Sequence, residues 1–428
     1  MVVDHSGAIR GETAVVVVGG GAAGIAAARR LREARVEALL IEAGPRLGGR
    51  AWTRADPVGL PLDVGCGWLH SADHNPWAPI AQEQGRVIDR TPPPWSRPSA
   101  PVGAPSFDGA DFMRAMQTFR GRVDALAESE SDRPAAAVLD PRGRWNALIN
   151  AVSTYYSGAE LDRVSARDLA RYDDSGVNWR VFDGYGTVIA AHGAGLPVEL
   201  DCAVERIDHR GRRLRVETTR GAIVAEAVIV TLSSNLIAAH EDLFLPALPE
   251  KTAAASGLPL GLADKLFLSL TDAQQFDSDS RAFGEATRTA TAVYQFRPFG
   301  RPLIEAYFGG ELAAALEAEG EAAFFDFAVR ELTGLFGADF SRRVAPVGLH
   351  CWGVDPLARG SYSYALPGKA DCRSALAAPV DGRIFFAGEA CSSTDYSTAH
   401  GAYLTGVAAA DQAIAALRRS GGAWLNGG

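Results

Sequence analysis

Residues 15–42 read VVVVGGGAAGIAAARRLREARVEALLIE, and this stretch decides the fold. Val15–Val18 is a β-branched apolar run, which is typical of a strand that is buried on both faces. The glycines that follow fit the pattern G-x-G-x-x-G, and residues 22–35 are rich in Ala, Leu and Arg, which favour a helix. A second strand, residues 36–41, ends at Glu42. This order of strand, glycine turn, helix, strand and acid predicts a Rossmann-like dinucleotide-binding unit.

The glycines and the acid of this unit have separate tasks at a dinucleotide site. Gly19 lets the chain turn, Gly21 lets the backbone approach a pyrophosphate, and Gly24 lets helix and strand pack closely. The helix N-terminus offers unpaired N–H groups to the phosphates. Glu42 follows where an acid can accept hydrogen bonds from an adenosine ribose. The predicted cofactor contacts of this unit are Gly19, Gly21, Ala23, Gly24, Glu42 and Ala43.

The composition of the whole chain narrows the class of protein. At 428 residues the chain is long enough for two core-bearing units or an interleaved pair of domains. Hydrophobic residues make up 47% and charged residues 22%, as in an ordinary globular protein. The net charge of −9 argues against a nucleic-acid partner. No segment reaches about 18 uninterrupted apolar residues, so we expect no membrane span.

The five cysteines are scattered and show no C-x-x-C spacing, so we predict neither a metal site nor a disulfide framework. A reducing compartment fits this usage best. The first twelve residues are interrupted by charged side chains and lack the apolar core of a secretory signal. We therefore expect a cytoplasmic protein.

A second candidate phosphate-binding loop follows the Rossmann-like unit. Residues 44–50 read GPRLGGR, so Arg46 and Arg50 flank a Gly-Gly pair that ends at Gly49. Two arginines beside a phosphate site can neutralise a pyrophosphate while the glycines keep the backbone close. An exposed loop with incidental charge is the alternative. The glycine pattern followed by R-x-G-G-R resembles the flavin-binding start of the FAD-dependent amine oxidases. That superfamily includes monoamine oxidases, polyamine oxidases and flavin-dependent histone demethylases.

Further motifs extend the resemblance from Val15 to about Ala415. Residues 62–70, LDVGCGWLH, resemble the D-x-G-x-x-W-x-H segment that runs along the flavin in the polyamine oxidase branch. Residues 386–389, FAGE, match the family segment that holds the ribityl–pyrophosphate part of FAD. Residues 400–406, HGAYLTG, open a helix whose N-terminus can stabilise negative charge on the reduced flavin. The further cofactor contacts that the resemblance implies are Arg46, Gly49, Arg50, Gly67, Trp68, Val204, Gly388, Glu389, Thr398, Ala399 and Ala402.

Lys265 is a candidate catalytic residue. Residues 262–270, LADKLFLSL, predict a strand whose alternation puts Lys265 and Phe267 on one face and leucines on the other. A buried ammonium is costly unless it is paired, and an edge or surface lysine is the alternative. The family has a lysine at this point that is hydrogen-bonded through a water to flavin N5. The resemblance thus implies the same role for Lys265.

Aromatic residues of the C-terminal third are candidates for the substrate site. Residues 351–364 match the family segment W-x-x-D-P…G-S-Y-S-Y, and Tyr362 aligns with the first of two aromatics that flank the substrate channel. Its ring face can orient an amine. Thr398 aligns with the second tyrosine of monoamine oxidases, and the demethylase branch also has Thr there. Two alternatives remain: the missing aromatic widens the cavity, or another aromatic, Trp352 or Tyr185, takes over this position.

The resemblance implies FAD as the cofactor, and the residue at position 361 predicts how it is held. Monoamine oxidases carry a cysteine there that bonds covalently to the flavin, whereas this chain has Ser361. A serine cannot form the thioether, so we predict noncovalent FAD.

The resemblance also implies an α/β fold in which a Rossmann-like FAD-binding domain of the GR2 type is interleaved with an α+β substrate-binding domain. The expected FAD-binding domain comprises residues 12–78, 185–258 and 350–420, and the substrate-binding domain comprises residues 79–184 and 259–349. Apolar spacing predicts helices at residues 112–128, 144–156 and 311–337. β-type composition predicts a strand at residues 197–207.

We therefore expect a flavin-dependent amine oxidase that acts on a small-molecule amine and O2. Hydride passes from the amine α-carbon to flavin N5, the imine is hydrolysed to an aldehyde or ketone, and O2 reoxidises the flavin to give hydrogen peroxide. One alternative is an L-amino acid oxidase or desaturase-type enzyme on the same scaffold, which would require an arginine in the cavity. A second alternative is a non-catalytic protein that binds FAD and interacts with other proteins. The oligomeric state is open, and a homodimer is one expectation.

Overall fold

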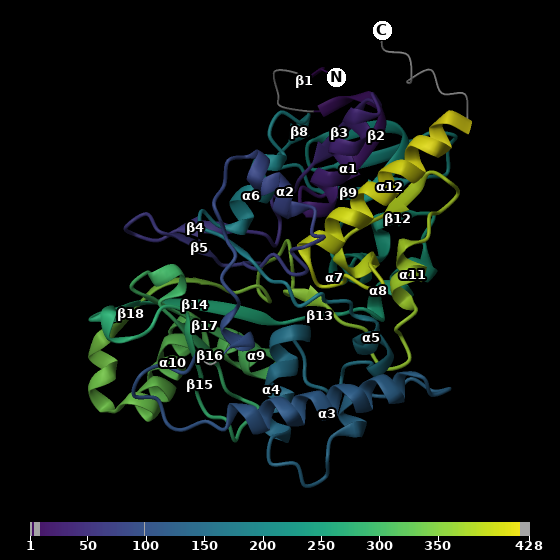
Figure 1. Ribbon diagram of the computed structural model, residues 1–428. Coiled ribbons are helices and arrows are strands. Elements are labelled where there is room, and N and C mark those ends of the chain that lie inside the picture. The colour runs from purple at the N-terminus through teal and green to yellow at the C-terminus, as the bar shows by residue number, and fades with distance from the viewer. Residues whose placement is uncertain (1, 4–8, 98, 420–428) are drawn as a thin grey trace.

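The computed structural model describes residues 2–3, 9–97 and 99–419, which form two sheets with helices around them (Figure 1). The larger sheet has the order β12-β9-β10-β11-β2-β3-β8, with β1 added to β2 and β20 added to β11. Its pairs β11–β2, β2–β3, β3–β8 and β11–β20 are parallel, as expected of a Rossmann-like unit. Its strands are β1 (Val2–Val3), β2 (Ile9–Val18), β3 (Ala38–Ile41), β8 (Val198–Glu199), β9 (Val204–Asp208), β10 (Leu214–Thr218), β11 (Gly221–Val230), β12 (Phe244–Leu245) and β20 (Ile384–Phe386).

Strand β2 lies between two apolar layers, which is why its valines form an unbroken run. Val15 and Val17 pack into the layer that contains helices α1 (Ala22–Glu33) and α12 (Ala399–Arg419). Val16 and Val18 pack into the layer on the other face. That second layer includes side chains of α7 (Ser234–Ala239), α8 (Pro249–Ser256) and α11 (Cys372–Ala377). Helix α12, from the C-terminal end of the chain, runs beside α1 (Figure 1).

The smaller sheet is antiparallel and has the order β15-β16-β17-β14-β18. Leu266 and Leu268 of β14 pack with Phe324 of α10 in one apolar core. The alternation predicted for this strand is confirmed, because Phe267 belongs to a separate cluster with Leu62. The strands are β14 (Ala263–Leu270), β15 (Ser280–Phe283), β16 (Val293–Phe296), β17 (Leu303–Gly309) and β18 (Val344–His350), and the covering helices are α9 (Gly310–Glu319) and α10 (Glu321–Phe336).

Three further helices share an apolar cluster that includes Phe112, Phe119 and Val152, and the longest of them runs near the bottom of Figure 1. They are α3 (Gly109–Ala127), α4 (Asn146–Ser157) and α5 (Ala166–Arg171). The remaining elements are short: α2 (Trp77–Glu83), α6 (Tyr185–His192), β4 (Thr53–Ala55), β5 (Pro61–Asp63), β6 (Ile88–Asp89), β7 (Arg180–Val181), β13 (Leu260–Gly261) and β19 (Tyr362–Ser363).

The predicted α/β fold with a Rossmann-like unit is confirmed, and so are the helices predicted at 112–128 and 144–156. The single helix predicted over 311–337 is two helices, because Gly320 interrupts it with a φ of +100°. The single strand predicted over 197–207 is wrong. It is two strands, β8 and β9, which lie on opposite sides of β2 in the sheet. Asp201 turns the chain between them with a φ of +51°, a conformation that a continuous strand cannot contain.

No helix among the described residues is both long and apolar enough to cross a membrane.

Candidate active site

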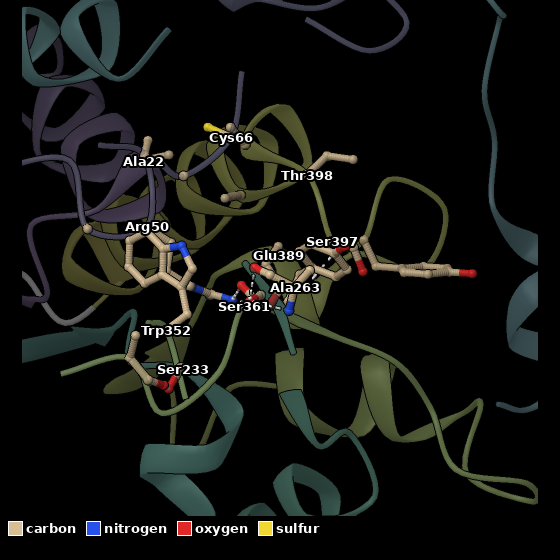
Figure 2. A pocket seen from close by; sticks show the side chains of 18 of the residues that line it. Ala22, Arg50, Cys66, Ser233, Ala263, Trp352, Ser361, Glu389, Ser397 and Thr398 are labelled. Carbon is tan, nitrogen blue, oxygen red and sulfur yellow. Dashed lines mark hydrogen bonds and ion pairs between the residues drawn. The ribbon is translucent and has the colours of Figure 1, made fainter. Parts of the chain in front are cut away.

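A cavity of about 990 Å³ extends from the glycine turn after β2 to the wall formed by the smaller sheet. It brings together residues that are far apart in the sequence, as Figure 2 shows for Arg50 and Glu389. The residues predicted from the sequence that line it are Gly19, Gly21, Ala23, Glu42, Ala43, Arg46, Gly49, Arg50, Gly67, Trp68, Val204, Lys265, Trp352, Tyr362, Gly388, Glu389, Thr398, Ala399 and Ala402. Gly24 lies beneath the turn instead. A Cβ added there would lie 1.9 Å from the carbonyl oxygen of Gly19, so this glycine permits the close packing of the helix on the turn.

The glycine turn leaves room for a ligand next to the backbone. A Cβ added at Gly21 or at Gly388 would meet no atom within 4 Å, and both residues face the cavity. Gly21 is also the N-cap of α1 and provides no side-chain cap to the helix. The first N–H groups of α1 are therefore available to an anion, which the helix dipole also favours.

Glu42 holds the turn and the following loop together at the edge of the cavity. Its Oε2 accepts a hydrogen bond from Gly20 N at 2.6 Å, and its Oε1 accepts one from Gly44 N at 2.7 Å. A carboxylate has about four acceptor sites, so each oxygen can accept a further bond from a ligand hydroxyl.

Arg50 and Glu389 form an ion pair in the middle of the cavity wall (Figure 2). Arg50 Nη1 donates to Glu389 Oε1 at 2.8 Å and to the carbonyl oxygen of Ser361 at 2.9 Å. The Ser363 hydroxyl donates to Glu389 Oε2 at 2.6 Å, and Ser397 N donates to the same oxygen at 3.0 Å. Burial opposes ionisation of Glu389, but the charge of Arg50 and the bond from Ser363 outweigh it and lower the pKa of this carboxyl.

Lys265 is buried in the cavity wall and is paired. Its Nζ lies 3.2 Å from Glu305 Oε1 and donates to the carbonyl oxygen of Asp63 at 3.0 Å. Burial acts to lower the pKa of Lys265, but the charge of Glu305 outweighs it, and the pKa is raised. The ammonium is therefore charged at neutral pH and keeps one N–H for a further acceptor.

Tyr362 lies on the short strand β19, which pairs with β13. Its hydroxyl lies 3.0 Å from the hydroxyl of Tyr307 and donates to the carbonyl oxygen of Tyr155. Burial, reinforced by Tyr307, raises the pKa of Tyr362 well above its usual value, so the phenol stays protonated. These bonds hold the ring of Tyr362 in one orientation at the cavity surface.

Thr398 and Trp352 both line the cavity, but the side chain of each is hydrogen-bonded to the protein backbone. Thr398 precedes the first residue of α12, and its hydroxyl accepts a hydrogen bond from Gly401 N at 3.0 Å, as an N-cap does. Trp352 Nε1 donates to the carbonyl oxygen of Val64 at 3.0 Å. Tyr185, the other proposed aromatic, is 1% exposed and belongs to the apolar core beside β2.

Ser361 has its hydroxyl bound in both directions by the backbone of Ala263. It donates to the Ala263 carbonyl oxygen and accepts from Ala263 N, each at 2.8 Å. Ser361 lines the cavity, as its place in the sequence motif suggests.

Several cavity residues on the smaller sheet escaped the sequence analysis, among them Glu305, Tyr307 and Arg281. Glu305 and Tyr307 alternate on β17, and Tyr307 lies directly opposite Lys265 on β14. Polar residues at alternate positions of an otherwise apolar strand could have indicated that one face of β17 lines a cavity. Nothing local marked Arg281. Among the described residues, no group of three His, Cys, Asp or Glu side chains is arranged to hold a metal ion.

Comparison with known proteins agrees with this arrangement. The family described as flavin containing amine oxidoreductase matches residues 138–414, and the NAD(P)-binding Rossmann-like domain matches residues 17–83. Polyamine oxidase 5 of Oryza sativa subsp. japonica is 30% identical over 438 residues, which cover 93% of this chain and 87% of that protein. Lysine-specific histone demethylase 1 homolog 1 of Arabidopsis thaliana is 27% identical over 95% of this chain and 52% of that protein.

A solved structure shows the same fold. Cyclohexylamine oxidase from Brevibacterium oxydans IH-35A superposes with a TM-score of 0.76 at 19% sequence identity, over 95% of this chain and all of that chain. The family match covers well over half of the sequence and includes the segments that bring Lys265, Tyr362 and Glu389 to one cavity. The chain is therefore an oxidoreductase of the flavin containing amine oxidoreductase family.

Proposed function

We propose that this protein is an FAD-dependent amine oxidase that uses O2 as the electron acceptor. The observation that carries the proposal is the cavity itself, which joins the glycine turn at Gly21 to the buried Lys265 and to Tyr362. When bound, FAD would supply the redox chemistry, taking a hydride from the amine α-carbon and passing the electrons to O2 with formation of hydrogen peroxide. The product imine is then hydrolysed to an aldehyde or ketone.

The residues of the cavity fit this cofactor. The open space beside Gly21 and Gly388, and the uncapped N-terminus of α1, suit the pyrophosphate. The two free acceptor positions of Glu42 suit ribose hydroxyls. Arg46 has its guanidinium 4.1 Å from the centre of the Trp52 ring and adds positive charge at the same end of the cavity.

Two residues are proposed to act on the substrate side. Lys265 has a free N–H with which it can hold a water beside the flavin, while Glu305 keeps the ammonium charged. Tyr362, which Tyr307 and the Tyr155 carbonyl hold in place, presents a ring face that orients the amine. Both groups position reactants, which is what the protein contributes when the cofactor carries the chemistry.

We also propose that the FAD-binding domain comprises residues 12–78, 185–258 and 350–420, and the substrate-binding domain residues 79–184 and 259–349. The two sheets support this division. The described strands of the larger sheet from β3 onward fall in the first set, and all five strands of the smaller sheet fall in the range 259–350. Residue 420 lies outside the described residues.

The test begins with the purified protein. We expect it to be yellow and to release FAD into the supernatant on acid denaturation, because Ser361 offers no thiol for a covalent bond. Flavin that stays with the precipitate would contradict noncovalent binding. A colourless protein that cannot be loaded with FAD would contradict the function.

Substrate oxidation is the second part of the test. Hydrogen peroxide is measured with polyamines, aryl-alkyl amines, cyclic amines and amino acids, and flavin bleaching is recorded without oxygen. Bleaching by amines supports an amine oxidase, and bleaching by α-amino acids alone supports the L-amino acid oxidase alternative. Bound flavin that no amine or amino acid reduces would indicate a desaturase-type enzyme or a non-catalytic binding protein.

A further inference from the structure

The smaller sheet places an arginine in the wall of the cavity, three strands from Lys265. Arg281 of β15 lies opposite Gln295 of β16, which lies opposite Glu305 of β17. Strand β17 pairs with β14, which carries Lys265. All four side chains belong to residues that line the cavity. On β14 the residue opposite Glu305 is Phe267, two positions from Lys265. Because neighbouring strands are about 4.8 Å apart and the rise along a strand is about 3.3 Å per residue, the backbone of Arg281 lies roughly 16 Å from that of Lys265.

The guanidinium of Arg281 has no carboxylate partner within residues 2–3, 9–97 and 99–419. Its side chain lies over the ring of Phe283, with Cζ 4.8 Å from the ring centre. The ionisable groups that act on it are the phenols of Tyr155 and Tyr156, and neither is a carboxylate. Burial raises the pKa of Tyr155, so that phenol stays protonated. Burial lowers the pKa of Arg281, but an arginine keeps its charge in a protein, so a positive charge remains in the wall.

The two arginines that are buried in the described part of the chain are both paired. Arg180 binds Asp279 at 2.7 Å, and Arg373 binds Asp168 at 2.6 Å. A partly buried charge without a partner is costly unless an anion or water satisfies it. The planar guanidinium matches a carboxylate with two parallel hydrogen bonds. Arg281 therefore has the chemistry of an anion site that is open toward the cavity.

The acids of the cavity interior leave little for a second ammonium group to bind. Three of them have a side-chain partner: Glu305 with Lys265, Asp355 with His350, and Glu389 with Arg50. Glu42 lies at the cofactor end of the cavity, where it binds Gly20 N and Gly44 N. Asp124 and Asp174 also line the cavity, but both are exposed, where solvent screens their charge. The interior thus favours a substrate whose second polar group is negative.

We propose that the amine substrate carries a carboxylate several bonds from its amine, and that Arg281 binds this carboxylate as an ion pair. The proposal rests on the proposed amine oxidase function and specifies its substrate class. The three-strand separation between Arg281 and Lys265 favours a carboxylate at the far end of the substrate over one on the reacting carbon. Arg281 would then select the substrate and set its orientation, while Lys265 and Tyr362 act at the amine.

The test uses the flavin-loaded enzyme without oxygen and compares amines that differ at the far end. These are 6-aminohexanoate, with a carboxylate, hexylamine, with a methyl group, and 1,6-diaminohexane, with a second amine. We expect 6-aminohexanoate to reduce the flavin with a second-order rate constant at least about tenfold above the others, the size of one charge-assisted hydrogen bond. Arg281→Gln should remove this preference.

The matched control is Arg330→Gln on α10. Arg330 also lies over an aromatic ring, that of Phe327 at 5.5 Å, but it is exposed and lies outside the lining of the cavity. It should keep the wild-type order of the three amines. Hexanoate, which has no amine to oxidise, gives a second readout through the change that it causes in the flavin spectrum. Its dissociation constant should rise at least about tenfold in Arg281→Gln and stay unchanged in Arg330→Gln.

Three results would overturn the proposal. The wild type could prefer hexylamine or the diamine, Arg281→Gln could keep the preference for 6-aminohexanoate, or 2-aminohexanoate could be the faster substrate. The last result would place the carboxylate beside the amine. If Arg281→Gln does not fold, Arg281→Lys keeps the charge without the planar fork and should show a reduced but measurable preference. Bound flavin that no amine reduces overturns the oxidase function itself, whereas reduction without a carboxylate preference overturns this proposal alone.

Discussion

Arg50 Nη1 lies 2.8 Å from Glu389 Oε1, although 339 positions separate the two residues in the sequence. The pair joins the loop after β3 to the end of β20, so the first and last parts of the Rossmann-like unit meet at one ion pair. Ser363 and Ser397 complete the bonding of the carboxylate. Because Arg50, Glu389 and Ser397 line the cavity, the same contacts stabilise the fold and shape the cofactor site.

Removing the charge of Glu389 should therefore affect both stability and flavin retention. Glu389→Gln leaves Arg50 without its anionic partner and replaces the charged acceptor of Ser363 and Ser397 by a neutral amide. We expect the free energy of unfolding to fall by about 2–4 kcal/mol and the FAD content to drop. Urea unfolding and the flavin-to-protein absorbance ratio measure the two effects. Glu319→Gln, at an exposed position of α9, is the control, and equal behaviour of the two variants would refute the structural role of the pair.

Lys265→Met should slow the reaction far more than it reduces FAD content. The change removes the free N–H of the ammonium and leaves Glu305 without its partner. We expect flavin reduction or reoxidation to slow by about 100-fold, as for the loss of a positioned donor at a reaction centre. Stopped-flow absorbance separates the two half-reactions. Lys369→Met, at an exposed position, should match the wild type. If Lys265→Met shows wild-type rates in both half-reactions, Lys265 has no part in the mechanism.

Thr398 should contribute as a helix cap rather than as a wall of an aromatic cage. Thr398→Ala removes the bond to Gly401 N and should lower the free energy of unfolding by about 1 kcal/mol. Thr398→Ser keeps the hydroxyl and should behave like the wild type, which makes it the matched control. Thermal or urea unfolding measures the difference. A loss of stability that is the same in the Ser and Ala variants would show that the methyl group, not the hydrogen bond, is responsible.

Stability should decrease on acidification below about pH 6.5, in part because of His400. Burial lowers the pKa of His400 to about 4, with Asp395 only partly opposing it. Between these pH values the unfolded chain binds a proton that the folded protein does not, so protonation favours unfolding. His400 contributes a loss of up to about 3 kcal/mol over that interval. His192, with a pKa lowered to about 4 by burial, adds to the same slope.

His400→Gln tests this assignment, because it removes one proton-binding group from both states. The free energy of unfolding, measured at several pH values between 4 and 7, should then depend less steeply on pH. His240→Gln, at an exposed position, should keep the wild-type slope. A slope in His400→Gln as steep as that of the wild type would assign the pH dependence to other groups.

The Rossmann-like unit was predictable because its determinants are local. The valine run of β2, the glycine turn and the helix α1 follow one another within residues 15–33, and each acts on its own neighbours through burial, backbone conformation or helix propensity. The prediction of a single strand at residues 197–207 failed because it relied on local composition alone. Composition typical of a strand continued on both sides of Asp201, while this single residue turned the chain into a second part of the sheet.

The substrate end of the cavity depended on long-range pairing that no local pattern encodes. Tyr307 meets Lys265, and Arg281 meets Gln295, only because β14, β17, β16 and β15 adopt one register. Whether a charged side chain of the sheet has an oppositely charged partner depends on that register and on the elements that pack over the sheet. Local sequence thus specified where a dinucleotide can bind, whereas the folding of distant strands against one another specified which charges face the substrate.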